Sequence, residues 1–282
     1  MKDFINGLKS YGKAIPFLFK KWFWLYAIFP FIVFLLVFSV GYYLNQFKYF
    51  NLPKEDDGII LSIYYYLLDG LILILSFALL NLTRYLMLGI ISPILSVIAQ
   101  RTEKMINSKK YDFSLKQLIK DVKRAIQIIF RNLIYETGII ISIIILFKII
   151  GYVLNELPIV LQWIEKGLII LIAFYYYGFS FMDYNLERWK INVAESAKYV
   201  RKHWGIALAI GSVFTPIFHY VNEFILIDNI EFISSNSNYY ILVILSALIC
   251  AIIPVWSMIA CTIAMSKMTD LDDNTVAIKE IT

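Results

Sequence analysis

The amino-acid sequence predicts an all-α protein: a polytopic integral membrane helical bundle with about six membrane-entering helices and two basic amphipathic helices on the cytoplasmic face. Three observations predict this class. Of the 282 residues, 60% are hydrophobic and only 17% are charged, whereas soluble domains are about half apolar and about a quarter charged. Long apolar runs recur along the chain, and lysine and arginine gather in alternate connections between them. No polar or low-complexity linker divides the chain, so residues 1–282 are expected to form a single membrane domain.

Six apolar segments are expected to enter the bilayer. The first, Trp22–Leu44, has no charge over 23 residues, which is enough to cross a hydrocarbon core of about 30 Å. The second, 59–91, is longer than one span needs and should tilt or protrude. The remaining segments are 133–154, 167–182, 204–221 and 239–265. Because 167–182 is short, the hairpins at 133–182 and 204–265 could cross fully or only partway; full crossing is the preferred topology.

The distribution of basic residues orients these segments. Lysine and arginine number 21 in the N-terminal stretch, 92–131, 183–203 and the C-terminal tail, but only 3 in the intervening connections. Because cytoplasmic connections are enriched in basic residues, both termini are predicted to be cytoplasmic.

Two of the cytoplasmic connections have the pattern of amphipathic helices. The first spans 115–131 after a capping box of Ser114 and Gln117, and the second begins at Asn192 with Glu195 three residues on. Both carry lysine and arginine opposite an apolar face. They could form a cytosolic vestibule that concentrates anions, or they could be juxtamembrane helices that obey the positive-inside rule.

Charged residues inside apolar segments are the first candidates for function, because each is costly in lipid unless it pairs or reaches water. Asp69 and Arg84 are about 22 Å apart on one helix, too far to pair with each other. Arg84 could snorkel to the headgroups, Glu136 is expected at an interface, and Lys148 stands in an otherwise apolar stretch.

Backbone features offer a second kind of candidate. A broken helix presents free N–H groups to an anion, and the candidate breaks are at Pro93, Pro158, Pro216 and Pro254. Small residues that predict close helix packing follow at Gly205, Ala207, Ala209 and Gly211.

Metal and enzyme chemistry are not expected. Cys250 and Cys261 lie roughly 16 Å apart along one helix, too far for a disulfide with each other, so they are read as small packing residues, with a thiol bridge between subunits or a metal site as alternatives. The chain has two histidines and no CxxC, HExxH, GxSxG or phosphate-binding glycine loop. The sequence therefore predicts no enzyme, no metal, no cofactor and no nucleic-acid partner.

The order and spacing of several motifs resemble CysZ-type sulfate permeases, the bacterial branch of the etoposide-induced transmembrane protein family. The likeness covers most of the chain. It runs through Phe4–Tyr11, a basic pair before a helix with Pro30, Ile91–Ile94 leading into Ala99–Glu103, Phe181–Trp189, Ala194–Lys202, Gly205–Gly211 and Ile253–Met265.

The resemblance implies a bacterial inner-membrane protein that admits sulfate to the cytoplasm, with two hairpins that enter the bilayer partway. Its anion site resembles a glycine-leucine-arginine turn just before the first membrane helix. Here the turn reads Pro16–Trp22, with Lys20 and Lys21 and no glycine, and lysine offers a point charge without a bidentate fork. The candidate anion-binding residues are Lys20, Lys21, Arg84 and Arg188.

Two function classes follow. The first is a permease or channel for a small inorganic anion, sulfate by resemblance. The second is a non-transporting membrane scaffold or assembly factor, which the scarcity of polar residues in the membrane segments favours. In both, the lipid bilayer is the main partner, and the small-residue faces are compatible with a homo-oligomer.

Overall fold

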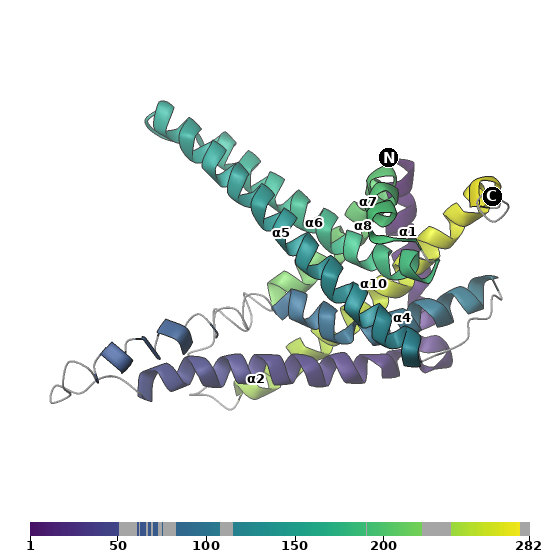
Figure 1. Cartoon of the computed structure of the whole chain (residues 1–282), viewed down its shortest axis with the longest axis horizontal. Coiled ribbons are helices and arrows are strands. Elements are labelled where there is room, and N and C mark those ends of the chain that lie inside the picture. Colours follow the sequence, from purple (N-terminus) through teal and green to yellow (C-terminus); the bar gives the residue numbers. More distant parts are fainter. Residues whose placement is uncertain are drawn as a thin grey trace. The chain divides into compact units, whose positions relative to one another are not determined.

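The computed structural model describes residues 1–50, 83–107, 115–189, 191–221 and 238–276, together with 61, 63–65, 67–68, 70–72 and 75. Within these ranges the side chains of 20–21, 45–50, 83–86, 107, 115–122, 125, 238 and 269–276 are not described. Nearly all of the described chain is helical and none of it is strand, so the all-α prediction is confirmed (Figure 1). The elements are α1 (Lys2–Phe19), η1 (Lys20–Ala27), α2 (Ile28–Phe50), α4 (Thr83–Asn107), α5 (Leu115–Val153), α6 (Ile159–Arg188), α7 (Val193–Lys202), α8 (Trp204–His219) and α10 (Asn238–Val276).

The chain divides into two compact units. One contains Met1–Tyr26, Ser92–Ile217 and Ile253–Thr282, and the other contains Ala27–Ile91 and Phe218–Ile252. Aromatic contacts join α2 to the end of α8 in the second unit, where Phe34 stacks on Phe38 and meets Phe218 edge-on at 6.1 Å. The candidate site described below lies entirely in the first unit. The prediction of a single membrane domain stays a prediction.

Four apolar stretches of helix are long enough to cross a bilayer, which confirms a membrane protein. They are Trp22–Leu44, Ile126–Val153, Ile159–Arg188 and Tyr239–Met268. Two shorter apolar helices, Ile63–Ile72 and Trp204–His219, fall in the predicted segments 59–91 and 204–221. Most of the side chains of 59–91, including Asp69 and Arg84, lie outside the described residues.

The N-terminal region contains a helix that sequence analysis did not predict. Helix α1 buries Gly7, Ser10, Tyr11, Ala14 and Leu18 along one face. The predicted span Trp22–Leu44 then begins in the 3-10 helix η1 and continues into α2. Trp22 itself has a positive φ of 63°, so the chain changes direction at the start of this span.

Helices α5 and α6 form a long antiparallel hairpin (Figure 1). The predicted basic helix 115–131 and the membrane segment 133–154 are one continuous helix of 39 residues. The predicted segment 167–182 belongs to a helix of 30 residues that already begins at Ile159, so the expectation of a short segment was wrong. The charged residues Glu165 and Lys166 interrupt the apolar run just before Gly167, where the predicted segment begins.

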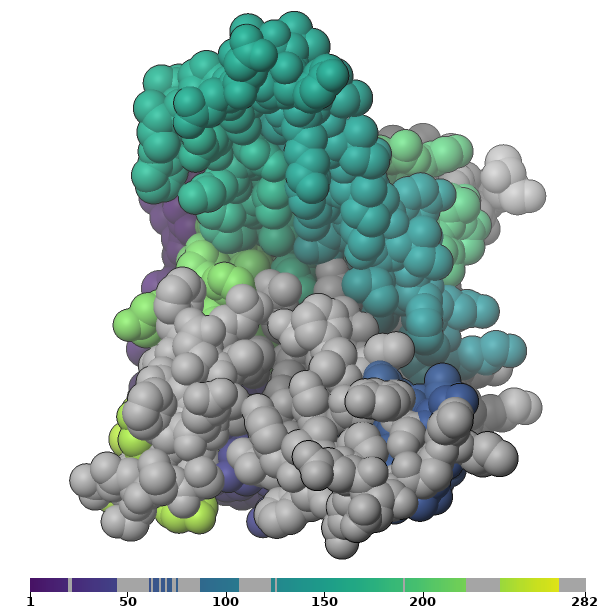
Figure 2. Space-filling view, turned by 90° about the vertical axis from the view of Figure 1, so that its left-hand side faces the viewer, coloured from purple at the N-terminus to yellow at the C-terminus, as the bar shows by residue number. Residues whose placement is uncertain are grey.

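The hairpin has the length of a bilayer. At its base, the Asn132 side-chain amide donates to the Ser180 hydroxyl at 3.2 Å. Val153 at the end of α5 and Ile159 at the start of α6 are each 21 residues from this contact, a rise of about 32 Å against a hydrocarbon core of about 30 Å. None of the 18-residue apolar window of α6 is buried, and the teal surface in Figure 2 shows how much of the hairpin is uncovered. Lipid therefore has access to both helices.

Three of the four candidate helix breaks do not occur. Pro93, Pro216 and Pro254 lie inside α4, α8 and α10, because an apolar helix tolerates the loss of one backbone hydrogen bond. Only Pro158 lies at a helix boundary: it is the residue just before α6, three positions after Asn155, which has a positive φ of 62°. Of the four predicted breaks, the hairpin turn is thus the one at which the helical backbone of the described chain is interrupted.

A cysteine at the hairpin turn should report how far the hairpin crosses. Glu156 is exposed at the turn, and a full crossing places Glu156→Cys on the outer face. We expect a membrane-impermeant maleimide to label this variant in intact cells at a rate close to that in permeabilised cells. The native cysteines give a low background because both are buried. Labelling of Glu156→Cys only after permeabilisation would place the turn inside the bilayer or the cell and contradict a full crossing.

Candidate functional site: a buried charged network

Helices α6 and α8 contact each other directly through their backbones, next to the candidate site. A Cβ at Gly178 would overlap the carbonyl group of Ala207, and a Cβ at Gly211 would overlap the carbonyl group of Phe174. The two contacts are reciprocal and one helical turn apart, which is the geometry of paired Cα–H···O contacts. This confirms the predicted close packing around Gly211 and fixes the position of the polar end of α6, which lies directly beyond.

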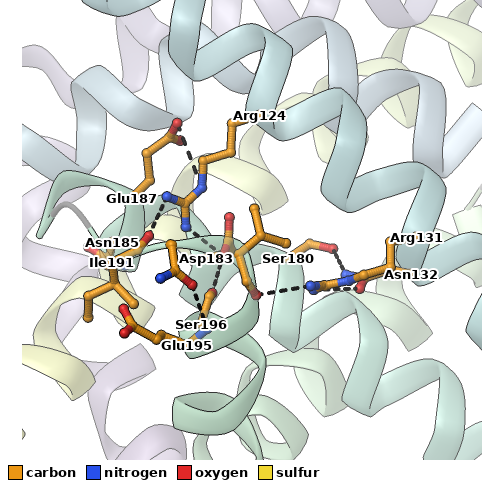
Figure 3. A network of polar contacts seen from close by, with 12 residues as sticks. Arg124, Arg131, Asn132, Ser180, Asp183, Asn185, Glu187, Ile191, Glu195 and Ser196 are labelled. Carbon is orange, nitrogen blue, oxygen red and sulfur yellow. Dashed lines mark hydrogen bonds and ion pairs between the residues drawn. The ribbon is translucent and has the colours of Figure 1, made fainter.

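Asp183 of α6 is the centre of a polar network (Figure 3). Its side chain is 3% exposed, and Oδ1 accepts hydrogen bonds from the Ser196 hydroxyl on α7 and from Nη2 of Arg124 on α5 at 3.2 Å. A buried carboxylate is stable only when paired and hydrogen-bonded, and here α5 and α7 supply the partners. Asp183 thus connects α5, α6 and α7.

Arg124 makes polar contacts with several groups of α6 and of the connection between α6 and α7. Its Nη1 donates to the carbonyl of Ile191 in the connection between α6 and α7, and its Nε lies 3.9 Å from Glu187 Oε1. Glu187 follows Asp183 by one helical turn on the same face of α6, so one guanidinium neutralises both carboxylates, as Figure 3 shows. Arginine suits this position because its planar fork presents several donors at fixed angles.

A second arginine on α5 makes the next set of contacts. Arg131, seven residues from Arg124, donates to the carbonyl of Val193 at 3.2 Å and places its guanidinium over the Phe179 ring at 4.8 Å. Residues seven apart lie on the same face of a helix. Arg124 and Arg131 therefore hold the beginning of α7 against α5 at two points.

The beginning of α7 has the predicted cap. The Asn192 side chain accepts a hydrogen bond from the backbone N–H of Glu195 at 2.9 Å, which confirms the helix start read from the sequence. The helix ends at His203, whose Nδ1 lies 3.2 Å from Asp3 Oδ2 on α1. Both ends of α7 are thus fixed by polar contacts.

Another buried pair lies at the C-terminal end of α6. Glu103 of α4 forms an ion pair with Arg188 and accepts a hydrogen bond from the Trp189 indole N–H at 3.2 Å. The side chains of Glu103 and Arg188 are 5% and 7% exposed. Both carboxylate oxygens of Glu103 are therefore engaged by the end of α6.

Helix α10 contacts the same polar end of α6. The Thr262 hydroxyl lies 3.1 Å from the side-chain oxygen of Asn185, and the Asn185 amide is 3.8 Å from Cys261 Sγ. Cys250 and Cys261 are buried free thiols, in agreement with a packing role. Among the residues that the structure describes, no group of histidine, cysteine, aspartate and glutamate could hold a metal ion.

Of the four predicted anion-binding residues, Arg188 is the one with a described side chain, and it lies beside another charged residue. Arg188 is engaged with Glu103, so its charge already has an anionic partner. The side chains of Lys20, Lys21 and Arg84 lie outside the described side chains. Of the other charges singled out, Glu136 is buried and Lys148 is exposed on α5.

The arrangement is a charge-matched cluster. Three carboxylates (Asp183, Glu187 and Glu103) face Arg124 and Arg188, with Arg131 beside them. Such a cluster fixes helices against one another, because removal of any member leaves a buried charge uncompensated. Sequence reasoning did not pair these charges. For α5 and α6 the available signal was the spacing of two acids four apart on α6 and two arginines seven apart on α5; no comparable signal indicated Glu103.

A family model described as "Sulfate transporter CysZ/Etoposide-induced protein 2.4" matches residues 10–221, a range that holds every charged member of the network. No curated protein matches the chain.

Proposed function

Because the chain belongs to the sulfate transporter CysZ/etoposide-induced protein 2.4 family, we propose that it is a permease that admits sulfate, or a closely similar small oxyanion, to the cytoplasm. The family match over residues 10–221 carries this proposal. The protein would act without catalytic chemistry of its own, in the cytoplasmic membrane of a bacterium, with both termini inside. Sulfate would move down its gradient or with a coupled ion.

Entry of a dianion requires cations and hydrogen-bond donors that replace its hydration. Lys20 and Lys21 are proposed for this role, since they stand just before the first membrane segment, where the family resemblance places the anion site. Lysine ammonium groups attract anions without the geometry that distinguishes one tetrahedral oxyanion from another. Selection among sulfate and its analogues should therefore be weak.

Uptake of labelled sulfate into liposomes that contain the purified protein tests the proposal. We expect saturable uptake above that of empty liposomes, and a fall of about tenfold in the Lys20→Ala, Lys21→Ala double variant, because two charges are removed from the entry site. The matched control is Lys104→Ala, Lys123→Ala, which removes two exposed lysines elsewhere and should leave uptake unchanged. An excess of selenate should compete with sulfate.

Absence of uptake from folded, correctly inserted protein would refute sulfate transport. That result would support the second candidate, a non-transporting scaffold or assembly factor. One observation favours this alternative: the buried charges of the network are matched among themselves, so Arg124 and Arg188 are already engaged by carboxylates. Uptake that is equal in the Lys20, Lys21 variant and its control would keep the permease and move the entry site elsewhere.

A further inference from the structure

Helix α1 presents three different faces. Its buried face packs on α8 and α10 through Gly7, which would meet Ala209 if it carried a Cβ, and through Tyr11. A second face is apolar but exposed, with exposed fractions between 38% and 77% at Ile5, Leu8, Ile15 and Phe19. The third face is basic and exposed, with Lys2, Lys9 and Lys13. At 100° per residue the apolar and basic stripes lie side by side, which is the pattern of a helix in a membrane interface.

Tyr11 fixes α1 to its neighbours. Its hydroxyl donates to the carbonyl of Ile210 at 2.9 Å and shares a second hydrogen bond with the Ser257 hydroxyl at 2.8 Å, while the Trp256 indole donates to the Tyr11 carbonyl at 3.0 Å. Burial raises the pKa of the Tyr11 phenol, so it keeps its proton and both contacts at physiological pH. The stripes of α1 are therefore held in a definite orientation relative to α10.

A lysine of α10 joins the basic stripe. Lys267 lies near Lys13 and Lys9, close enough for the three like charges to repel one another. Like charges so close are unfavourable unless an anion lies between them. The one acidic residue of α1, Asp3, faces His203 instead.

The position of Lys267 gives the depth of this cluster. It is the last residue but one of the apolar stretch Tyr239–Met268, and a lysine at the end of a membrane span lies at the level of the lipid headgroups. Lys9 and Lys13 lie near Lys267 and therefore at the same depth. The middle of α1 thus lies at headgroup depth, with its exposed apolar stripe beside the acyl chains.

We propose that Lys9, Lys13 and Lys267 form a binding site for the phosphate of an anionic phospholipid. The phosphate oxygens accept hydrogen bonds from the three ammonium groups and relieve their repulsion, and the acyl chains cover Ile5, Leu8, Ile15 and Phe19. A free oxyanion would neutralise the lysines but would leave that apolar stripe uncovered, so the combination of stripes fits a lipid. The site is independent of the proposed transport function.

Native mass spectrometry of the full chain tests the site. Delipidated protein in an uncharged detergent is mixed with phosphatidylglycerol or phosphatidylcholine, and the bound lipids are counted. We expect wild-type protein to prefer phosphatidylglycerol, and the variant Lys9→Gln, Lys13→Gln, Lys267→Gln to lose about tenfold or more of that preference, since each lysine at an anionic surface contributes several-fold. The control Lys104→Gln, Lys123→Gln, Lys198→Gln removes the same charge from three exposed lysines and should keep the preference.

Further variants and a competition experiment test whether the lysines bind a lipid phosphate. The triple arginine variant at 9, 13 and 267 keeps the charge and should keep the preference, and the single variant Lys9→Gln, at an exposed position, gives a readout if the triple variant does not fold. An unchanged lipid preference in the folded glutamine variants overturns the proposal. Inorganic phosphate that binds through the same lysines and displaces phosphatidylglycerol at millimolar concentration would also overturn it, because the ligand would then be a free oxyanion.

Discussion

Replacement of Gly178 by leucine is expected to abolish recovery of folded protein, and replacement by alanine to destabilise it strongly. Even the single methyl group of alanine would overlap the carbonyl oxygen, carbonyl carbon and Cα of Ala207. These are backbone atoms of a helix, so no side-chain rotation can make room, and α6 and α8 must move apart. Overpacking typically costs about 1–3 kcal/mol, and a backbone clash belongs at the upper end.

The separation of α6 from α8 would affect more than one contact. Gly211 makes the reciprocal approach to Phe174, and Phe214 packs between the rings of Tyr177 and Phe181, with centroid distances of 5.7 and 5.0 Å. The measurement is the yield of monodisperse protein in size-exclusion chromatography, followed by thermal unfolding in detergent. The two variants of Gly178 should form a graded series, with alanine less damaging than leucine.

Gly167 provides a matched control on the same helix. A Cβ at this position would meet nothing within 4 Å, so Gly167→Ala should leave stability unchanged or raise it by up to about 1 kcal/mol through helix propensity. A Gly178→Ala variant as stable as Gly167→Ala would show that the helices are farther apart than the structure places them. Equal losses at both glycines would instead indicate a general effect of substitution in α6.

Sequence analysis predicted the parts of the fold that depend on uninterrupted apolar runs. The span Trp22–Leu44 has the same bounds in both, and Tyr239–Met268 differs from the predicted segment by three residues at one end. Helix α1 was missed although Ile5, Leu8, Ile15 and Phe19 recur at helical spacing, because its buried face includes Gly7 and Ser10, which give no apolar signal. Burial of these residues depends on the close approach of α8, which only the folded chain provides.

The candidate site was less predictable, because its pairs join distant parts of the chain. Glu103 and Arg188 are 85 residues apart, and nothing local to either indicates the other. Arg188 was singled out as a cation for a bound anion, whereas its charge is engaged by a carboxylate. By contrast, the cap at Asn192 is a local interaction between neighbouring residues, and sequence analysis predicted it.

The second large effect is expected at Arg124. Its removal in Arg124→Ala leaves Asp183 and Glu187, one helical turn apart and buried, without their shared guanidinium. It also leaves the Ile191 carbonyl without its donor. Loss of one partner from a buried ion pair costs roughly 3–5 kcal/mol, because the remaining charge stays in a medium of low polarity. We expect a lower unfolding temperature and faster tryptic cleavage of the connection between α6 and α7.

A double-mutant cycle separates this pairing from general damage. Asp183→Ala should cost a similar amount, since Ser196 and Arg124 lose their acceptor, and the double variant should cost less than the sum by about 1–3 kcal/mol. Lys123→Ala, an exposed neighbour on α5, is the control and should be silent. Additive effects would mean that Arg124 and Asp183 stabilise the protein separately. An Arg124→Ala variant as stable as the wild type would mean that the other contacts of α7, such as that of Arg131 with Val193, are sufficient, and that the network does not fasten α7 to α5 through Arg124.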